Sequence, residues 1–243
     1  MTTRRIRRLT TLLAVVGLST LAACSGSGNR PLHAMRADGD RGFDVGDYAT
    51  AADHYQQYVD VKPSDADIRY KLGRSYLELG RYADARQNLQ VAYDLKPDTE
   101  EYIDAYAESL MRSGEKEQLF AFLTKVVNER GKASDYLRQG EYGMQIGNAD
   151  DAVAALLTAA KLDGGVNARF QIALAKFYQQ VGDNAKETER LRMAYFLAPN
   201  NAHVRERAAA LGQVLGPTFA LRPLETQYGP SAADTGQPSG TKR

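Results

Sequence analysis

The chain has 243 residues, and its formal net charge of +1 shows none of the basic excess that is typical of a nucleic-acid-binding protein. Hydrophobic residues make up 43% of the sequence, which is enough for a folded core. Four of the 31 basic side chains lie in residues 1–23, which contain no acidic residue, so the rest of the chain is mildly acidic.

Residues 1–23 have the pattern of an export signal. Four arginines precede an apolar run over residues 9–21, which is too short to span a bilayer and has the length of a signal-peptide core. The leader ends in Leu21-Ala-Ala-Cys24-Ser25, which resembles the lipobox of bacterial lipoproteins. Cys24 is the single cysteine of the chain, so a disulfide within the chain is impossible. The alternative is a free cysteine near an ordinary secretory signal.

The resemblance to bacterial lipoproteins implies that Cys24 takes a diacylglycerol on its sulfur and that the leader is cut before it. Acyl chains contribute roughly 0.8 kcal/mol per buried methylene, so this lipid would hold the protein on a membrane without a spanning helix. Residues 24–31 would form a flexible linker of small and polar residues. Because Ser25 rather than Asp follows the cysteine, the resemblance favours the outer membrane, with the protein facing the periplasm.

Two markers then repeat with one period along the chain. Glycines in turn positions are spaced by 34, 34, 33 and 35 residues, at Gly46, Gly80, Gly114, Gly147 and Gly182. Residues that end each unit share the same four spacings, at Pro63, Pro97, Gly131, Gly164 and Pro199. A fixed period of this length is typical of stacked helical repeats.

Residues 66–99 form the best-defined unit, two short amphipathic helices joined by a turn at Gly80. The apolar and small residues of its first helix are Leu72, Gly73 and Tyr76, and those of its second helix are Tyr82, Ala85, Leu89 and Ala92. These residues resemble the tetratricopeptide repeat, a helix-turn-helix unit of 34 residues. The alternative is an irregular helical bundle with accidental periodicity.

The resemblance implies an all-α fold, a right-handed superhelical solenoid of about five helical hairpins. The hairpins are expected at residues 32–65, 66–99, 100–132, 133–167 and 168–201, followed by a capping helix at 202–215. Three copies depart from the pattern, with Gly39 and Gly42 in the first helix of the chain and with Leu119 and Glu187 where small residues are expected. Residues 216–243 are rich in Pro, Gly, Ser and Thr, so we expect a disordered tail in which Phe219–Leu224 is able to dock on the last helices.

The sequence offers little chemistry for catalysis. His33, His54 and His203 lie in different segments without metal-ligand spacing, and no Gly-rich phosphate loop or nucleophile elbow is present. We therefore expect no enzymatic activity, no metal, and no cofactor beyond the covalent lipid on Cys24.

In the tetratricopeptide family the first helices of the hairpins line a concave groove. The resemblance places there Asp67, Tyr70, Arg74, Leu77, Glu101, Asp104, Glu108, Met111 and Arg112, with Leu137, Glu141 and Met144 on the next first helix. This mixed and acidic set favours a protein or peptide partner with a basic or amphipathic segment, and no nucleic acid. The alternative is an ordinary solvated surface.

Together these features predict a membrane-anchored scaffold or adaptor for protein–protein interactions in the bacterial cell envelope. Lipidated tetratricopeptide proteins of this kind support assembly of pili, of outer-membrane proteins or of peptidoglycan machinery. The alternative is a structural lipoprotein that self-associates and recruits no other protein.

The leader yields a first prediction. Replacement Cys24→Ala should abolish lipid attachment and leave uncut precursor, because acylation and the lipoprotein-specific cut both require the thiol. Metabolic labelling with a fatty acid and fractionation of membranes would measure this, with Ser25→Ala as the control. A mature, membrane-bound Cys24→Ala protein would contradict the assignment.

Overall fold

The computed structural model describes residues 30–228. The expected signal peptide, the lipidation site Cys24 and residues 229–243 of the expected tail lie outside this range. Within it the structure has eleven α-helices, one short 3-10 helix and no strand.

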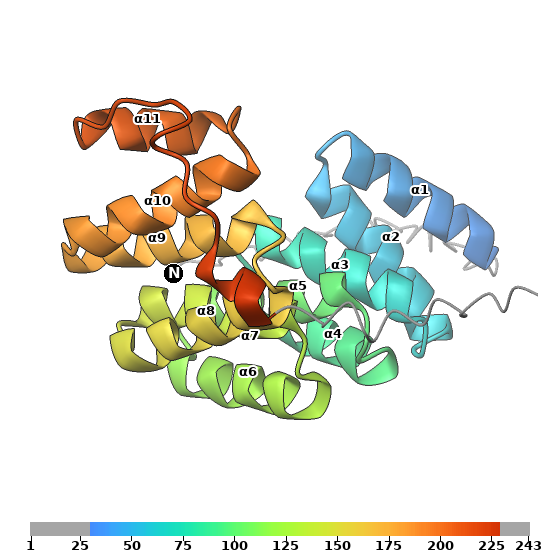
Figure 1. Cartoon of the computed structure of the whole chain (residues 1–243). Coiled ribbons are helices and arrows are strands. Elements are labelled where there is room, and N and C mark those ends of the chain that lie inside the picture. The colour runs from blue at the N-terminus through green and yellow to red at the C-terminus, as the bar shows by residue number, and fades with distance from the viewer. Residues whose placement is uncertain (1–29, 229–243) are drawn as a thin grey trace, which may run out of the picture.

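The helices follow one another as antiparallel pairs that stack into a curved solenoid (Figure 1). The hairpins are α1 (Leu32–Asp44) with α2 (Tyr48–Val61), α3 (Ala66–Glu78) with α4 (Tyr82–Leu95), α5 (Glu100–Arg112) with α6 (Lys116–Arg130), α7 (Ala133–Ile146) with α8 (Ala149–Asp163), and α9 (Ala168–Val181) with α10 (Asn184–Leu197). Helix α11 (Ala202–Ala210) follows, and α1 and α11 lie at the two upper ends of the curve in Figure 1. The expected all-α superhelical solenoid of five hairpins and a further helix is confirmed.

The periodic turn glycines all adopt the left-handed backbone conformation. Their φ angles are +78° at Gly46, +72° at Gly80, +77° at Gly114, +86° at Gly147 and +76° at Gly182. A side chain is strained in this region of φ, whereas glycine enters it freely. The sequence period therefore reflects a backbone requirement repeated in every hairpin.

Small residues hold the two helices of a hairpin in close contact. A Cβ atom added to Gly73 would lie 2.5 Å from Cγ of Leu89, and one added to Gly140 would lie 2.5 Å from Cγ of Leu156. Ala85, on the facing side of the second hairpin, is fully buried. The hairpin core leaves no room for even one additional carbon at these positions.

The third hairpin departs from this pattern. Leu119 stands at the position of Ala85 and is fully buried, and α5 and α6 approach each other less closely than the helices of the other four hairpins. Aromatic rings fill the wider space, since Phe122 packs against Tyr93 and Tyr106 with ring centroids 5.0 and 4.7 Å apart. The larger side chain is accommodated by separating the helices.

In the fifth hairpin the residue that departs from the small-residue pattern, Glu187, attaches α11. Glu187 has no exposed surface, and its two carboxylate oxygens accept hydrogen bonds from Nε and Nη2 of Arg207 at 2.5 and 2.9 Å. A buried carboxylate of this kind is stable only when it is paired, so the acidic residue in a small-residue position makes α11 necessary to the last hairpin.

Two expectations at the C-terminal end are wrong. The capping helix ends at Ala210 rather than at residue 215, because Gly212 turns the chain with φ of +71°. The segment from residue 216 is not a disordered tail up to residue 226. As expected for Phe219–Leu224, it packs on the last helices, and Phe219 is 5% exposed in a core cluster that includes Leu191. Docking of this aromatic residue attaches the segment to the last helices, while Pro217, Thr218 and Arg222 stay exposed.

Residues 30–228 contain no helix long and apolar enough to cross a membrane.

Close packing inside the second hairpin yields a stability prediction. Replacement Ala85→Leu should lower the free energy of unfolding by roughly 1 to 3 kcal/mol, because the added carbons have no space between α3 and α4. Ala83→Leu, on the exposed side of the same helix, is the matched control. Chemical denaturation of both variants would measure the difference, and equal stability would contradict the packing described for Ala85.

Candidate functional site

The first helices α3, α5, α7 and α9 line the inner side of the solenoid. Of the groove residues predicted from the sequence, Leu77 is wrong, because it has no exposed surface and packs in the core cluster with Leu72. The others remain at least partly exposed on α3 and α5, namely Asp67, Tyr70, Arg74, Glu101, Asp104, Glu108, Met111 and Arg112.

Ion pairs cross the inner side from each first helix to the next. Nζ of Lys71 on α3 lies 2.5 Å from Asp40 on α1, and Nη1 of Arg74 lies 3.0 Å from Glu108 on α5. A corresponding ion pair, described below, joins α7 to α5. Several charges expected to contact a partner therefore already hold neighbouring repeats together.

Asp67 and Tyr70 have fixed partners as well. Asp67 accepts a hydrogen bond from Nζ of Lys96 at 2.8 Å and one from the hydroxyl of Tyr102 at 2.5 Å, and both lower the pKa of this carboxyl. The ring of Tyr70 stacks on that of Tyr102, with centroids 5.0 Å apart. At this end of the inner side, Asp67 is therefore already paired with Lys96, and the ring of Tyr70 is packed on the buried ring of Tyr102.

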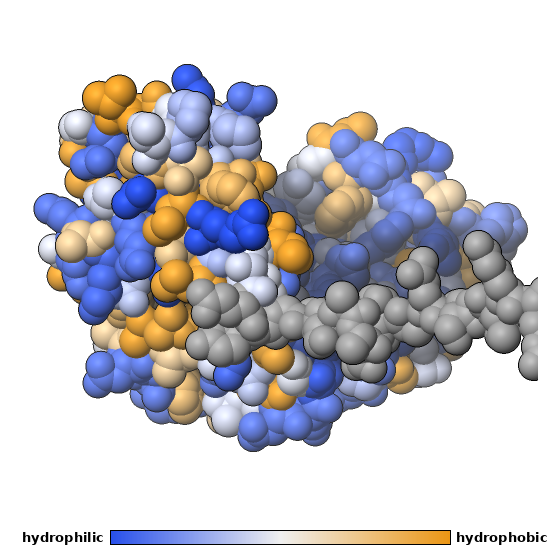
Figure 2. All heavy atoms as spheres, in the orientation of Figure 1, coloured by the Kyte–Doolittle hydropathy of each residue, from blue (hydrophilic) through white to orange (hydrophobic). Residues whose placement is uncertain are grey.

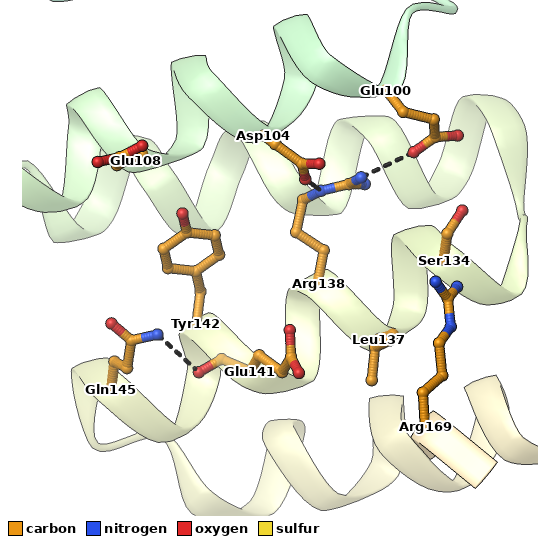
Figure 3. A pocket seen from close by; sticks show the side chains of 10 residues that line it. All are labelled: Glu100, Asp104, Glu108, Ser134, Leu137, Arg138, Glu141, Tyr142, Gln145 and Arg169. Atoms are coloured by element: carbon orange, nitrogen blue, oxygen red, sulfur yellow. Dashed lines mark hydrogen bonds and ion pairs between the residues drawn. The ribbon is translucent and has the colours of Figure 1, made fainter. Parts of the chain in front are cut away.

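A hollow of about 610 Å³ lies further along, between α5, α7 and α9 (Figure 3). We call it the inner hollow. Its wall contains four acids, two arginines, one aromatic ring and one apolar side chain that matter below, namely Glu100, Asp104, Glu108, Glu141, Arg138, Arg169, Tyr142 and Leu137. The sequence placed Asp104 and Glu108 in the groove and Glu141 and Leu137 on the next helix, and the structure brings these four together.

Arg138 crosses the hollow and is the important residue that the sequence analysis missed. Its side chain is 8% exposed and donates to Asp104 at 2.5 Å, to Glu100 at 2.7 Å and to the buried Asp135 at 3.0 Å. Asp104 precedes Arg138 by 34 residues, the same separation as in the pair of Arg74 and Glu108. Opposite charges one repeat apart were thus a signal that could have identified both contacts.

The carboxylate oxygens of the inner hollow differ in whether they already accept a hydrogen bond from an arginine. Glu100 uses both oxygens on Arg130 and Arg138, and Glu108 uses both on Arg74 and Arg112. Asp104 uses one oxygen, and Glu141 has no ion-pair partner within the described part of the chain. The open acceptors of the hollow are therefore on Asp104 and Glu141.

The surroundings of these acceptors shift the pKa values of Glu141 and of the neighbouring Tyr142. Burial raises the pKa of Glu141, Asp104 adds to this effect, and the cations Lys176, Arg169 and Arg138 offset only part of it. Burial, followed by the charges of Glu108 and Asp104, raises the pKa of Tyr142 to about 12. Tyr142 remains a neutral hydroxyl at pH 7, and a cation entering the hollow would relieve the repulsion on Glu141.

Residues 30–228 contain no group of three or more His, Cys, Asp or Glu side chains that could hold a metal ion.

The arginine network yields a second stability prediction. Replacement Arg138→Met should cost about 1–3 kcal/mol of unfolding free energy, less than the about 3–5 kcal/mol typical of a broken buried pair, because Arg130 still pairs with Asp135. Arg169→Met removes an exposed arginine of the same hollow that has no ion pair among residues 30–228, and should cost no more than about 0.5–1 kcal/mol. Urea denaturation would compare them, and equal losses would contradict a structural role for Arg138.

Comparisons with known proteins agree with this architecture. The family model of the tetratricopeptide repeat matches residues 39–99. A search of curated proteins finds no match.

Solved structures share the fold at low sequence identity. A MamA structure from Desulfovibrio magneticus RS-1 is 16% identical with a TM-score of 0.56, covering 70% of this chain and 97% of that one. A thermophilic TPR protein from Thermus thermophilus is 21% identical with a TM-score of 0.53, covering 74% of this chain and 98% of that one. YrrB, a TPR protein with an unusual peptide-binding site, is 15% identical with a TM-score of 0.52, covering 75% and 94%. The sequence match to the tetratricopeptide repeat thus covers residues 39–99, and the helical-hairpin fold that the chain shares with these structures continues through α10.

Proposed function

We propose that the protein is a non-enzymatic scaffold for protein–protein interactions whose inner hollow binds a basic segment of a partner. Tetratricopeptide-repeat proteins bind peptide or protein partners, and one solved relative in fold, YrrB, has a peptide-binding site. The observation that carries the proposal is the open acceptor capacity of Asp104 and Glu141 in a hollow large enough for a side chain and its backbone.

The charge of the hollow favours a cation over an anion. Its two arginines are outnumbered by its four acids, and Arg138 is already held by Glu100 and Asp104. A lysine or arginine of the partner would meet Glu141 on one side and the ring of Tyr142 on the other, where aromatic faces also attract cations. The apolar side chain of Leu137 gives an amphipathic segment a further contact.

We further propose that lipid on Cys24 anchors the solenoid to the outer membrane, facing the periplasm. The lipobox-like residues Leu21–Cys24 support this part of the proposal. Helix α1 begins at Leu32, and a fully extended linker from Cys24 would span at most about 28 Å. The groove would then act on partners near the membrane, in assembly of pili, of outer-membrane proteins or of peptidoglycan machinery.

Charge reversal in the hollow tests the proposed function. Replacement Glu141→Lys should weaken binding of a fluorescein-labelled amphipathic lysine peptide at least about tenfold, equivalent to about 1.4 kcal/mol. Glu129→Lys, an exposed acid on the second helix α6, is the charge-matched control and should bind as the wild type does. Glu108 is unsuitable for this test, because it holds Arg74 and Arg112.

Salt and pH separate this site from non-specific attraction. Binding of the lysine peptide should weaken as salt rises and as the pH falls from about 7 to about 5, because protonation of Glu141 begins at higher pH than for an ordinary glutamate. A peptide with glutamates in place of the lysines should not bind. Equal binding by the wild type and Glu141→Lys would overturn the hollow as the site, and a stable dimer without peptide affinity would favour the self-associating alternative.

A further inference from the structure

A segment near the C-terminal end, residues 213–226, runs back along the solenoid after α11. We call it the strap. It passes from α11 across α10 and ends in the 3-10 helix η1 (Leu224–Tyr228) against α8 (Figure 1). It lies on the outer side, where the second helices are, and Figure 2 shows that apolar residues gather on this face mainly over α8–α11. The residues that the strap contacts in the hydrogen bonds and ring contacts below do not line the inner hollow.

Phe219 makes the first attachment of the strap. Its ring meets that of Tyr195 at 5.6 Å between centroids. Arg192 fixes the backbone on both sides, since its Nε donates to the carbonyl of Phe219 at 2.8 Å and its own carbonyl accepts from the amide of Leu221 at 3.2 Å. The strap forms a turn here, since the amide of Phe219 donates to the carbonyl of Gly216 at 3.0 Å, and one aromatic anchor and two hydrogen bonds to Arg192 hold this turn on α10.

Glu225 makes the second attachment, in a socket formed by α9 and α10. Its carboxylate accepts from Nη1 of Arg190 at 2.5 Å and from Nε2 of Gln171 at 3.0 Å. Arg190 is 8% exposed and Gln171 has no exposed surface. Arg190 also donates to Oε1 of Gln171 at 3.0 Å, so the solenoid itself orients both donors. We call these two residues the carboxylate socket.

The carboxylate socket requires a carboxylate group, but that group need not belong to Glu225. An arginine buried without a counter-charge is strongly unfavourable, so removal of Glu225 alone would be costly. Any carboxylate brought to the same place by another segment removes that cost. Release of the strap is therefore coupled to capture of a different acidic segment.

The furrow that holds the strap is a repeated feature of the outer side. The strap fills part of it: beside the turn from α8 to α9, a Cβ added to Gly165 would lie 2.8 Å from Cβ of Pro223, and a cavity of about 320 Å³ remains between Leu157 of α8, Arg190 of α10 and the strap. One repeat earlier, between α6 and α8, the corresponding furrow holds no segment of residues 30–228 and contains a cavity of about 280 Å³ beside Phe120 and Tyr136. The strap thus occupies a groove that the repeat architecture forms without it.

We propose that the furrow between α8 and α10 is a second peptide-binding surface, closed in the free protein by the strap. Its partner is a segment of another protein that carries an aromatic residue followed six residues later by glutamate and that adopts the same turn and 3-10 helix as the strap, the arrangement of Phe219 and Glu225. The partner's glutamate enters the carboxylate socket and its aromatic ring takes the place of Phe219. Binding at this surface displaces the strap and does not depend on the inner hollow.

The test uses the full chain with the strap opened by Glu225→Lys, which places a cation beside Arg190. The probe is a fluorescein-labelled peptide of residues 216–228, and a second peptide has glutamine in place of Glu225. The opened variant should bind the first peptide at least about tenfold more tightly than the wild type does, and the glutamine peptide at least about tenfold more weakly. Glu206→Lys, an exposed acid on α11, is the charge-matched control and should behave as the wild type.

Further measurements keep the proposal falsifiable if Glu225→Lys does not fold. Phe219→Ala loosens the strap without breaking the buried ion pair and should also bind the peptide more tightly than the wild type. In the wild type, excess peptide should speed chymotryptic cleavage of the chain after Phe219, because this buried residue becomes accessible when the strap is displaced. No gain in peptide binding by either folded variant, or equal binding of both peptides, would overturn the proposal. Wild-type dimers that Glu225→Lys abolishes would also overturn it, and would identify the occupant as the strap of a second copy.

Discussion

The close approach of two helices within each hairpin is the constraint on which the rest of the molecule depends. Where Gly73 faces Leu89 and Gly140 faces Leu156, no additional carbon fits, and this sets the distance between the layers of the solenoid. Each hairpin buries its apolar face only against its neighbours, so an error at one such position would change the curvature of the whole stack. The turn glycines serve the same constraint, since a tight reversal between packed helices requires positive φ.

The departures from the small-residue rule show how the fold adapts. Leu119 widens the third hairpin, and the aromatic cluster of Tyr93, Tyr106 and Phe122 fills the space. Glu187 instead brings a charge into the last hairpin, which is tolerated because Arg207 on α11 satisfies both of its oxygens. Each exception is offset by a neighbour that the repeat consensus does not contain.

Charges serve two different purposes on the two sides of the solenoid. On the inner side, ion pairs such as Arg138 with Asp104 connect consecutive first helices and leave the acceptors of Glu141 and Asp104 open. On the outer side, Arg190 is enclosed and has Glu225 of the strap as its ion-pair partner. An exposed, partly satisfied charge suits reversible recognition at little structural cost. A buried charge makes the contact conditional on a matching partner.

The sequence by itself determined the helical class, the period, the turn positions and the number of hairpins, because local backbone and packing requirements recur in each copy and leave Gly80, Gly73 and Ala85 in register. Tertiary structure alone decided which of the predicted groove residues are buried or already held in hydrogen bonds and ion pairs within the solenoid. Leu77 shares a helix face with Arg74 in sequence but lies in the core, and Asp67 is held by Tyr102 from the next repeat. The sequence indicated that Phe219–Leu224 is able to dock, but the partners of Phe219 and the docking of Glu225 were decided there, since these partners lie 24 or more residues away and a Pro- and Gly-rich segment has no periodicity that reveals them. Long-range pairing depends on where the solenoid's curvature places each surface, and a single repeat does not contain that information.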